Sequence, residues 1–204
     1  MKIMKKQIIA VAVLSALVVP VFAVASTSVG IGFHNTTIDG QSLPAATLNM
    51  GAVVGKDYLV DGDLVDGAGN HMNYFRGRAS VGKLYSFLGG VMTPELLAGY
   101  ERLGYGAGHL SAAYAGAGVT YTYQMGDLGL AVGGSVGRDF DTSASVDPAT
   151  VGGLFYEGEA AVDFSGFGPG VLDISYRYRH LPISVADNLH LNTSSVGIGY
   201  HVAF

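Results

Sequence analysis

Apolar and polar residues alternate one by one along much of this chain of 204 residues. Residues 171–179 show the pattern best: Leu172, Ile174, Tyr176 and Tyr178 alternate with Asp173, Ser175, Arg177 and Arg179. Because a β-strand sends successive side chains to opposite faces, this period of two predicts a sheet with one apolar and one charged face. Residues 119–124, 154–164 and 195–204 repeat the pattern. The sequence therefore predicts an all-β fold.

Two all-β architectures fit this alternation, a soluble sandwich and a membrane barrel. The apolar face packs into a core in a sandwich, whereas in a membrane barrel it faces lipid and polar side chains line the lumen. Segments of about 11–13 residues exceed ordinary globular strands and suit a tilted membrane crossing. Short turns also alternate with longer polar stretches at 35–44, 139–151 and 182–191. We predict a closed antiparallel up-and-down transmembrane β-barrel with these stretches as external loops.

The N-terminal residues have the pattern of a secretory signal peptide. Three lysines, Lys2, Lys5 and Lys6, precede an uncharged run over 8–25 that ends in the small-x-small triplet Ala23-Val24-Ala25. A membrane anchor is the alternative, since this run is near the lower limit for a spanning helix, but Pro20 and the alanines favour cleavage. We predict a signal peptide at 1–25, Sec-type export, and an outer-membrane barrel domain at 26–204.

The number of strands is harder to read than their presence. Nine segments are recognisable, starting near residues 27, 45, 71, 92, 112, 127, 152, 169 and 192. A bacterial single-chain barrel has an even number of strands. We predict eight; ten is the alternative, in which residues 57–66 supply a further strand after a turn at Gly55-Lys56-Asp57.

Several segments resemble a known family. Residues 174–179 (ISYRYR) and 196–200 (VGIGY) resemble the last two strands of the small opacity-type outer-membrane β-barrel family, which includes surface antigens and adhesins. Residues 93–100 and 116–119 are similar to its middle strands. The chain end also resembles the C-terminal strand that outer-membrane barrels present to their assembly machinery. This resemblance implies an assembly signal at Tyr200, Val202 and Phe204.

Charged residues at alternate positions are candidates for the lumen. They are Arg76, Arg78, Glu95, Glu101, Glu157, Glu159, Asp163, Asp173, Arg177 and Arg179. Side chains fill the interior of an eight-stranded barrel, and acids and bases together can pair across it. We expect these residues to form a structural plug; a gated polar pore is the alternative.

Catalytic and metal-binding patterns are weak. Residues 133–137 match G-x-S-x-G but lie within an alternating strand, where a nucleophile elbow does not occur. Residues 176–180 resemble the strand that leads to the histidine of outer-membrane lipid A deacylases, yet Leu181 and Pro182 follow His180 where that family needs a serine. The acidic residues of 57–66 do not fit a calcium loop. Solvated surface charge explains them better than cation bridging to lipopolysaccharide. We expect no enzyme activity, cofactor or metal site.

The predicted function is that of an integral outer-membrane barrel with a structural or surface-interaction role, in envelope integrity or in adhesion through external loops. A small passive channel is the alternative, and a lipid A-modifying enzyme is a weaker one. Expected partners are outer-membrane lipid, lipopolysaccharide and the barrel assembly machinery. No basic stripe favours nucleic acid, and we expect a monomer.

Overall fold

The computed structural model describes residues 24–38, 40–69, 71–106, 108–145, 148–150, 153–185 and 189–204. The predicted signal peptide therefore lies outside the described residues, apart from Val24 and Ala25 at the start of the first strand. Within the described part of the chain, no helix is long and apolar enough to cross a membrane.

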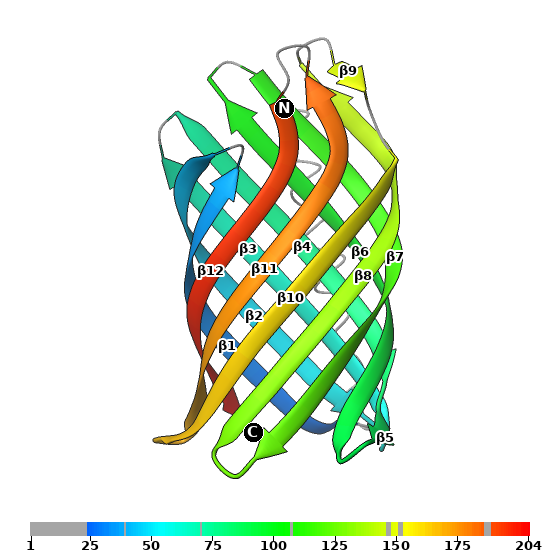
Figure 1. Cartoon of the computed structure of the whole chain (residues 1–204), viewed down its shortest axis with the longest axis vertical. Helices are drawn as coiled ribbons and strands as arrows, with labels where there is room; N and C mark the ends of the chain where they lie inside the picture. The colour runs from blue at the N-terminus through cyan, green and yellow to red at the C-terminus, as the bar shows by residue number, and fades with distance from the viewer. Residues whose placement is uncertain are drawn as a thin grey trace.

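Ten long strands close into a single barrel in the described part of the chain (Figure 1). They are β1 (Val24–Ile38), β2 (Gln41–Val54), β3 (Tyr58–Gly69), β4 (Met72–Lys83), β6 (Gly90–Tyr105), β7 (Gly108–Met125), β8 (Leu128–Ala144), β10 (Leu154–Phe167), β11 (Gly170–Val185) and β12 (Leu189–Ala203). Each pairs antiparallel with its neighbours in the chain, and β1 pairs with β12 from Ser28↔Ala203 to Ile38↔Thr193. This last pairing closes the barrel and rules out the open sheets of a sandwich.

Two short strands extend the barrel wall at opposite rims. β5 (Tyr85–Phe87) pairs with β6 beyond the end of β4, and β9 (Pro148–Thr150) pairs with the far end of β11. Figure 1 shows β5 at the lower rim and β9 at the upper rim.

The prediction of eight strands is wrong, and the alternative of ten is confirmed. The missing strand is β3, which follows a turn at 55–57 where Gly55 adopts a positive φ of 65°. Alternation is faint here because several inward positions of β2 and β3 are themselves apolar: Leu43, Ala45 and Val65 are buried inside the barrel. With apolar residues on both faces, the period of two disappears from the sequence.

The three predicted external loops are also largely strand. β1 and β2 occupy most of 35–44, β8 continues to Ala144, and β11 and β12 leave only 186–188 between them. Polar composition misled the prediction because backbone pairing continues beyond the apolar part of each strand. The outward side chains become polar there while the ladder of backbone hydrogen bonds persists, as between Thr37 and Ser194.

The start of β1 and the end of β12 lie side by side at one rim, the lower one in Figure 1, where Ser28 pairs with Ala203. Backbone amides and carbonyls of Thr27 and Phe204 are hydrogen-bonded there at 2.8 and 3.2 Å. The connections at 55–57, 126–127 and 168–169 lie at the same rim. In bacterial outer-membrane barrels with an even number of strands, this is the periplasmic side. We call it the periplasmic rim and the opposite one the external rim.

The outer face of the barrel is an apolar band. On β8, for example, the outward positions are Leu128, Leu130, Val132, Gly134 and Val136, followed by the exposed Arg138. This run covers about 9–11 residues, the length that a tilted strand needs to cross a bilayer. Exposed aromatic residues, including Tyr58, Tyr85 and Phe87, lie near the periplasmic rim, where an aromatic girdle is expected.

Candidate functional site in the barrel lumen

The external half of the lumen is filled by an apolar cluster, here called the external core. Its members are Ile38, Leu43, Ala45, Val65, Met72, Tyr74, Leu97, Leu103, Leu110, Ala112, Tyr114, Phe155 and Leu181. Several of them flank the connections of the external rim: Ile38 and Leu43 on either side of 39–40, and Leu103 and Leu110 on either side of 106–107. The rings of Tyr114 and Phe155 pack edge to face at 5.2 Å.

A glycine in the barrel wall leaves room for the aromatic rings of the external core. Gly137 on β8 lies against Phe155, and a Cβ at this position would overlap the Phe155 ring and the carbonyl of Ala115. The G-x-S-x-G match at 133–137 is therefore explained by close packing of a strand. Ser135 is buried and points inward within β8.

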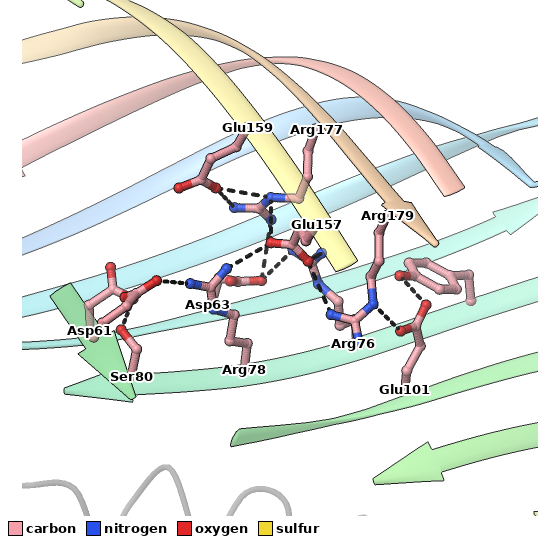
Figure 2. A network of polar contacts seen from close by, with 12 residues as sticks. Asp61, Asp63, Arg76, Arg78, Ser80, Glu101, Glu157, Glu159, Arg177 and Arg179 are labelled. Carbon is pink, nitrogen blue, oxygen red and sulfur yellow. Dashed lines mark hydrogen bonds and ion pairs between the residues drawn. The ribbon is translucent and has the colours of Figure 1, made fainter. Parts of the chain in front are cut away.

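Below the external core lies a network of ion pairs, here called the central network and shown in Figure 2. It consists of Asp63, Arg76, Arg78, Glu95, Glu101, Glu157, Glu159, Arg177 and Arg179. These residues come from β3, β4, β6, β10 and β11, which lie on different sides of the barrel.

Glu157 on β10 is the centre of the network. Its carboxylate oxygens lie 2.8 Å from Arg78 Nη1 and 3.0 Å from Arg179 Nη1. They also lie 3.5 Å from Arg177 Nε and 3.7 Å from Arg76 Nη1. Three strands separate β4 from β10 along the barrel wall, so the contact of Arg78 with Glu157 crosses the lumen. One carboxylate thus ties opposite walls together.

Arg179 joins the central network to the external core. Its side chain is fully buried, and its Nε lies 3.2 Å from Glu101 Oε2. Its guanidinium carbon lies 3.9 Å from the centre of the Tyr114 ring, a cation–π contact. Tyr74 donates a hydrogen bond of 2.8 Å to the other oxygen of Glu101. Charge neutralisation and ring stacking therefore act on the same buried guanidinium.

The periplasmic half of the lumen contains a cavity of about 370 Å³. Polar and small side chains line it, among them Asp61, Thr122, Ala131, Glu159 and His201. Polar side chains around the cavity make fewer contacts with one another than those of the central network do. His201 Nε2 lies 2.6 Å from Asp173 Oδ1, and Ser80 Oγ lies 3.4 Å from Asp61 Oδ1.

The structure places all ten charged residues of the predicted lumen set on inward-facing positions. Nine of them form ion pairs: eight belong to the central network, and Asp173 pairs with His201. Asp163 lies farther toward the periplasmic rim, directly opposite Asp173 on the neighbouring strand, and has no ion pair among the described residues.

Sequence reasoning missed the inward role of Asp61 and Asp63. Their composition predicts solvated surface charge, but Asp63 Oδ2 lies 2.7 Å from Arg76 Nη2 and is buried, whereas Asp61 faces the cavity. Their spacing of two residues could have placed them on one face of a strand. Asp57 lies in a turn and Asp66 is exposed on the outer face, so the four aspartates share no site. Within the described residues, no group of three or more acidic or histidine residues could hold a metal ion.

The aromatic partners of Arg179 were missed as well. Tyr74 and Tyr114 are buried inside the barrel, but neither lies in a stretch where alternation separates the inward from the outward face. Only the pairing register reveals which face they occupy.

The C-terminal residues Tyr200, Val202 and Phe204 occupy alternate positions on the outward face. Tyr200 donates a hydrogen bond of 2.9 Å to the carbonyl of Phe167, and Phe204 is 78% exposed. Their role as an assembly signal stays a prediction.

His180 lies on the outward face of β11 and has no catalytic partner among the described residues. Its Nδ1 lies 2.5 Å from the amide oxygen of Asn192, and its ring stacks on Tyr156 at 4.8 Å. An amide in this position cannot serve as the serine nucleophile that a deacylase requires.

Comparison with known proteins adds support for the fold. No family model and no curated protein sequence matches the chain. In fold it is similar to the β-domain of the Bordetella autotransporter BrkA, with 12% identity, a TM-score of 0.51, and coverage of 89% of this chain and 100% of that one. The NanC porin gives 11% identity, a TM-score of 0.50, and coverage of 83% and 98%. Neisserial surface protein A gives 12% identity, a TM-score of 0.41, and coverage of 88% and 96%.

The closed antiparallel barrel, its apolar outer band and its likeness in fold to the BrkA β-domain and the NanC porin define the class of protein: the chain is an integral β-barrel protein of the bacterial outer membrane. The predicted localisation is confirmed. The resemblance to small outer-membrane barrels is confirmed at the level of the fold.

Proposed function

We propose that this protein has a structural and surface-interaction role in the outer membrane, and that its lumen does not conduct solutes. The observation that carries the proposal is the central network together with the external core above it. Glu157 connects opposite walls, and buried apolar side chains fill the space toward the external rim. A solute would have to break buried ion pairs, which is costly because it leaves unpaired charges in a confined interior.

The alternative of a small passive channel has one observation in its favour, the cavity of about 370 Å³. This cavity occupies the periplasmic half of the lumen. The likeness to the NanC porin shows a shared fold and does not extend to conduction. We therefore keep the closed lumen as the preferred proposal.

We expect this protein to contact other surfaces through the rigid strand ends at its external rim more than through loops. Three connections at the external rim, at 39–40, 70–71 and 106–107, are short, whereas β8 and β10 present exposed apolar side chains near that rim. Phe140 is 70% exposed and Leu154 is 73% exposed. Exposed apolar side chains on a rigid scaffold are suited to contact another surface at low entropic cost.

Planar-bilayer recording of the full chain, refolded in detergent and checked for heat-modifiable gel mobility, tests the closed lumen. We expect a folded protein that gives no resolved conductance steps, while a porin reconstituted in the same way does. Steady conductance by the folded wild-type protein would overturn the proposal. Double substitution of Phe155→Ala and Arg179→Ala should create intermittent conductance if the protein still folds.

We also propose that residues 1–25 are removed on export and that Tyr200, Val202 and Phe204 are recognised by the assembly machinery. N-terminal sequencing of membrane-extracted protein should start at Ser26. Phe204→Ser should lower the amount of protein assembled in the membrane, because the exposed terminal aromatic would be lost from the outward face. Normal assembly of that variant would count against the signal.

A further inference from the structure

The apolar band on the outer face ends at a row of polar residues toward the external rim. On six of the ten long strands, β1, β3, β4, β6, β8 and β12, the first outward polar side chain is Asn35, Asp66, Asn73, Arg102, Arg138 and Ser194, respectively. This row marks the height at which the surface passes from acyl chains to headgroups, since polar side chains are tolerated near the interface and not at the bilayer midplane.

Arg102 and Arg138 are the two cationic members of this row. The chain has six arginines, and the other four pair with carboxylates inside the lumen. Neither Arg102 nor Arg138 has an ion pair among the described residues. Both lie on outward positions, because they alternate with Leu96 and Ala98 on β6 and with Val132 and Val136 on β8.

These two arginines lie on either side of one strand. Arg102 is directly opposite Ser111 of β7, and Arg138 is directly opposite Ala115 of the same strand. Two strand spacings, about 10 Å, separate them across the wall, and four residues of β7, about 13 Å, separate them along it. A ligand that carries two separate anionic groups matches this arrangement better than a single phosphate does.

A strip of small side chains, here called the alanine surface, lies below the two arginines toward the bilayer centre, between Leu96 and Tyr100 on β6 and Val132 and Val136 on β8. Ala98 of β6 pairs directly with Ala115 of β7, and Val119 of β7 pairs with Gly134 of β8. Ala117 is also exposed on this face. Side chains of one carbon or none leave low relief, so straight acyl chains can lie close to the backbone.

We propose that this face of β6, β7 and β8 binds a phosphorylated glycolipid of the outer leaflet, that is, lipopolysaccharide. Its phosphates contact Arg102 and Arg138, and its acyl chains lie over the alanine surface. Arginine suits phosphate because its planar guanidinium donates two parallel hydrogen bonds to the phosphate oxygens. This proposal concerns the outer wall and does not depend on whether the lumen conducts.

The test is binding of purified lipopolysaccharide to the full-length folded protein in detergent, with R102Q, R138Q and the double variant compared to wild type. We expect about a tenfold loss of affinity in each single variant and a larger loss in the double variant, because charge-assisted hydrogen bonds are removed. K56Q is the matched control, since Lys56 is an exposed cation in a turn at the periplasmic rim. It should bind like wild type.

Two further arms separate the possible sources of the phosphate. Dephosphorylated lipopolysaccharide should bind wild type as weakly as intact lipopolysaccharide binds the double variant. Vesicles of phosphatidylglycerol should show no difference between wild type and the double variant. Equal lipopolysaccharide binding by heat-modifiable wild-type and double-variant protein would overturn the proposal, as would an equal effect of K56Q. A difference with phosphatidylglycerol as large as with lipopolysaccharide would reject the choice of glycolipid.

Discussion

The two halves of the lumen differ in packing although one set of strands forms both. Toward the external rim, inward positions carry large side chains such as Tyr114, Phe155 and Leu181, and these are buried. Toward the periplasmic rim, inward positions carry small or polar side chains such as Ser28, Gly199 and Ala131, and a cavity remains. The size of the inward side chains, and not the barrel wall itself, therefore decides where the lumen is filled.

The difference also separates two kinds of charge pairing. In the central network each arginine contacts two or three carboxylates, and Glu157 contacts four arginines. At the cavity, His201 has Asp173 as its one ion-pair partner among the described residues, and its side chain is 33% exposed. Substitutions in the external half and the central network should therefore destabilise the barrel more than those around the cavity.

Arg179→Ala should have the largest effect. It leaves Glu101 without an ion-pair partner among the described residues, takes one of four arginines from Glu157, and removes the stacking on Tyr114. We expect a loss of about 3–5 kcal/mol in the free energy of unfolding, measured by urea titration in lipid vesicles. Arg177→Ala is the matched control: its side chain is 26% exposed beside the cavity, so its loss should cost less. Arg177 belongs to the same network but lies where it meets the cavity, so equal effects of the two would contradict the expected dependence on burial.

Phe155→Ala should follow. The ring is buried against Tyr114 and the glycine wall of β8, so its removal leaves a void that these neighbours cannot fill. We expect a loss of about 3 kcal/mol in the same titration. A loss below about 1 kcal/mol would show that the external core is loosely packed.

Two substitutions of alanine by leucine, one in each half of the lumen, compare how much free volume the two halves contain. Ala112→Leu adds volume to the external core, where Ala112 is buried, and should cost about 1–3 kcal/mol. Ala131→Leu places the same side chain at the cavity wall and should change stability by less than about 0.5 kcal/mol, because space exists for it. If Ala131→Leu proved the more harmful, the cavity would not exist in the membrane-embedded protein.

The smallest effect is expected at the edge of the cavity. Asp173→Asn keeps the shape of the side chain and removes the charge that faces His201. Because this pair is partly exposed, we expect a loss of about 0–1 kcal/mol. The unfolding midpoints of wild type and variant, recorded side by side, would reveal a larger role for this pair if they differed by more.

Alternation predicted the fold class and the inward face of the charged strands. It worked for β10 and β11 because Glu157, Glu159, Arg177 and Arg179 alternate with apolar outward residues. It failed for β3, and hence for the strand count, because Val65 and its inward neighbours on β2 are apolar too. It placed Asp63 on the surface, since an acidic residue near a turn has the composition of a solvated loop.

The amino-acid sequence by itself determined that this chain forms β-strands, that one face of them suits lipid, and that its charges of both signs can share a lumen. These follow from local spacing, because the strand period is the same whatever surrounds it. Only the tertiary structure decided that ten strands close the barrel, which carboxylate meets which arginine, and where the cavity lies. Those depend on register and closure, which bring together residues as far apart as Arg78 and Glu157. Spacing along the chain cannot specify contacts across a barrel.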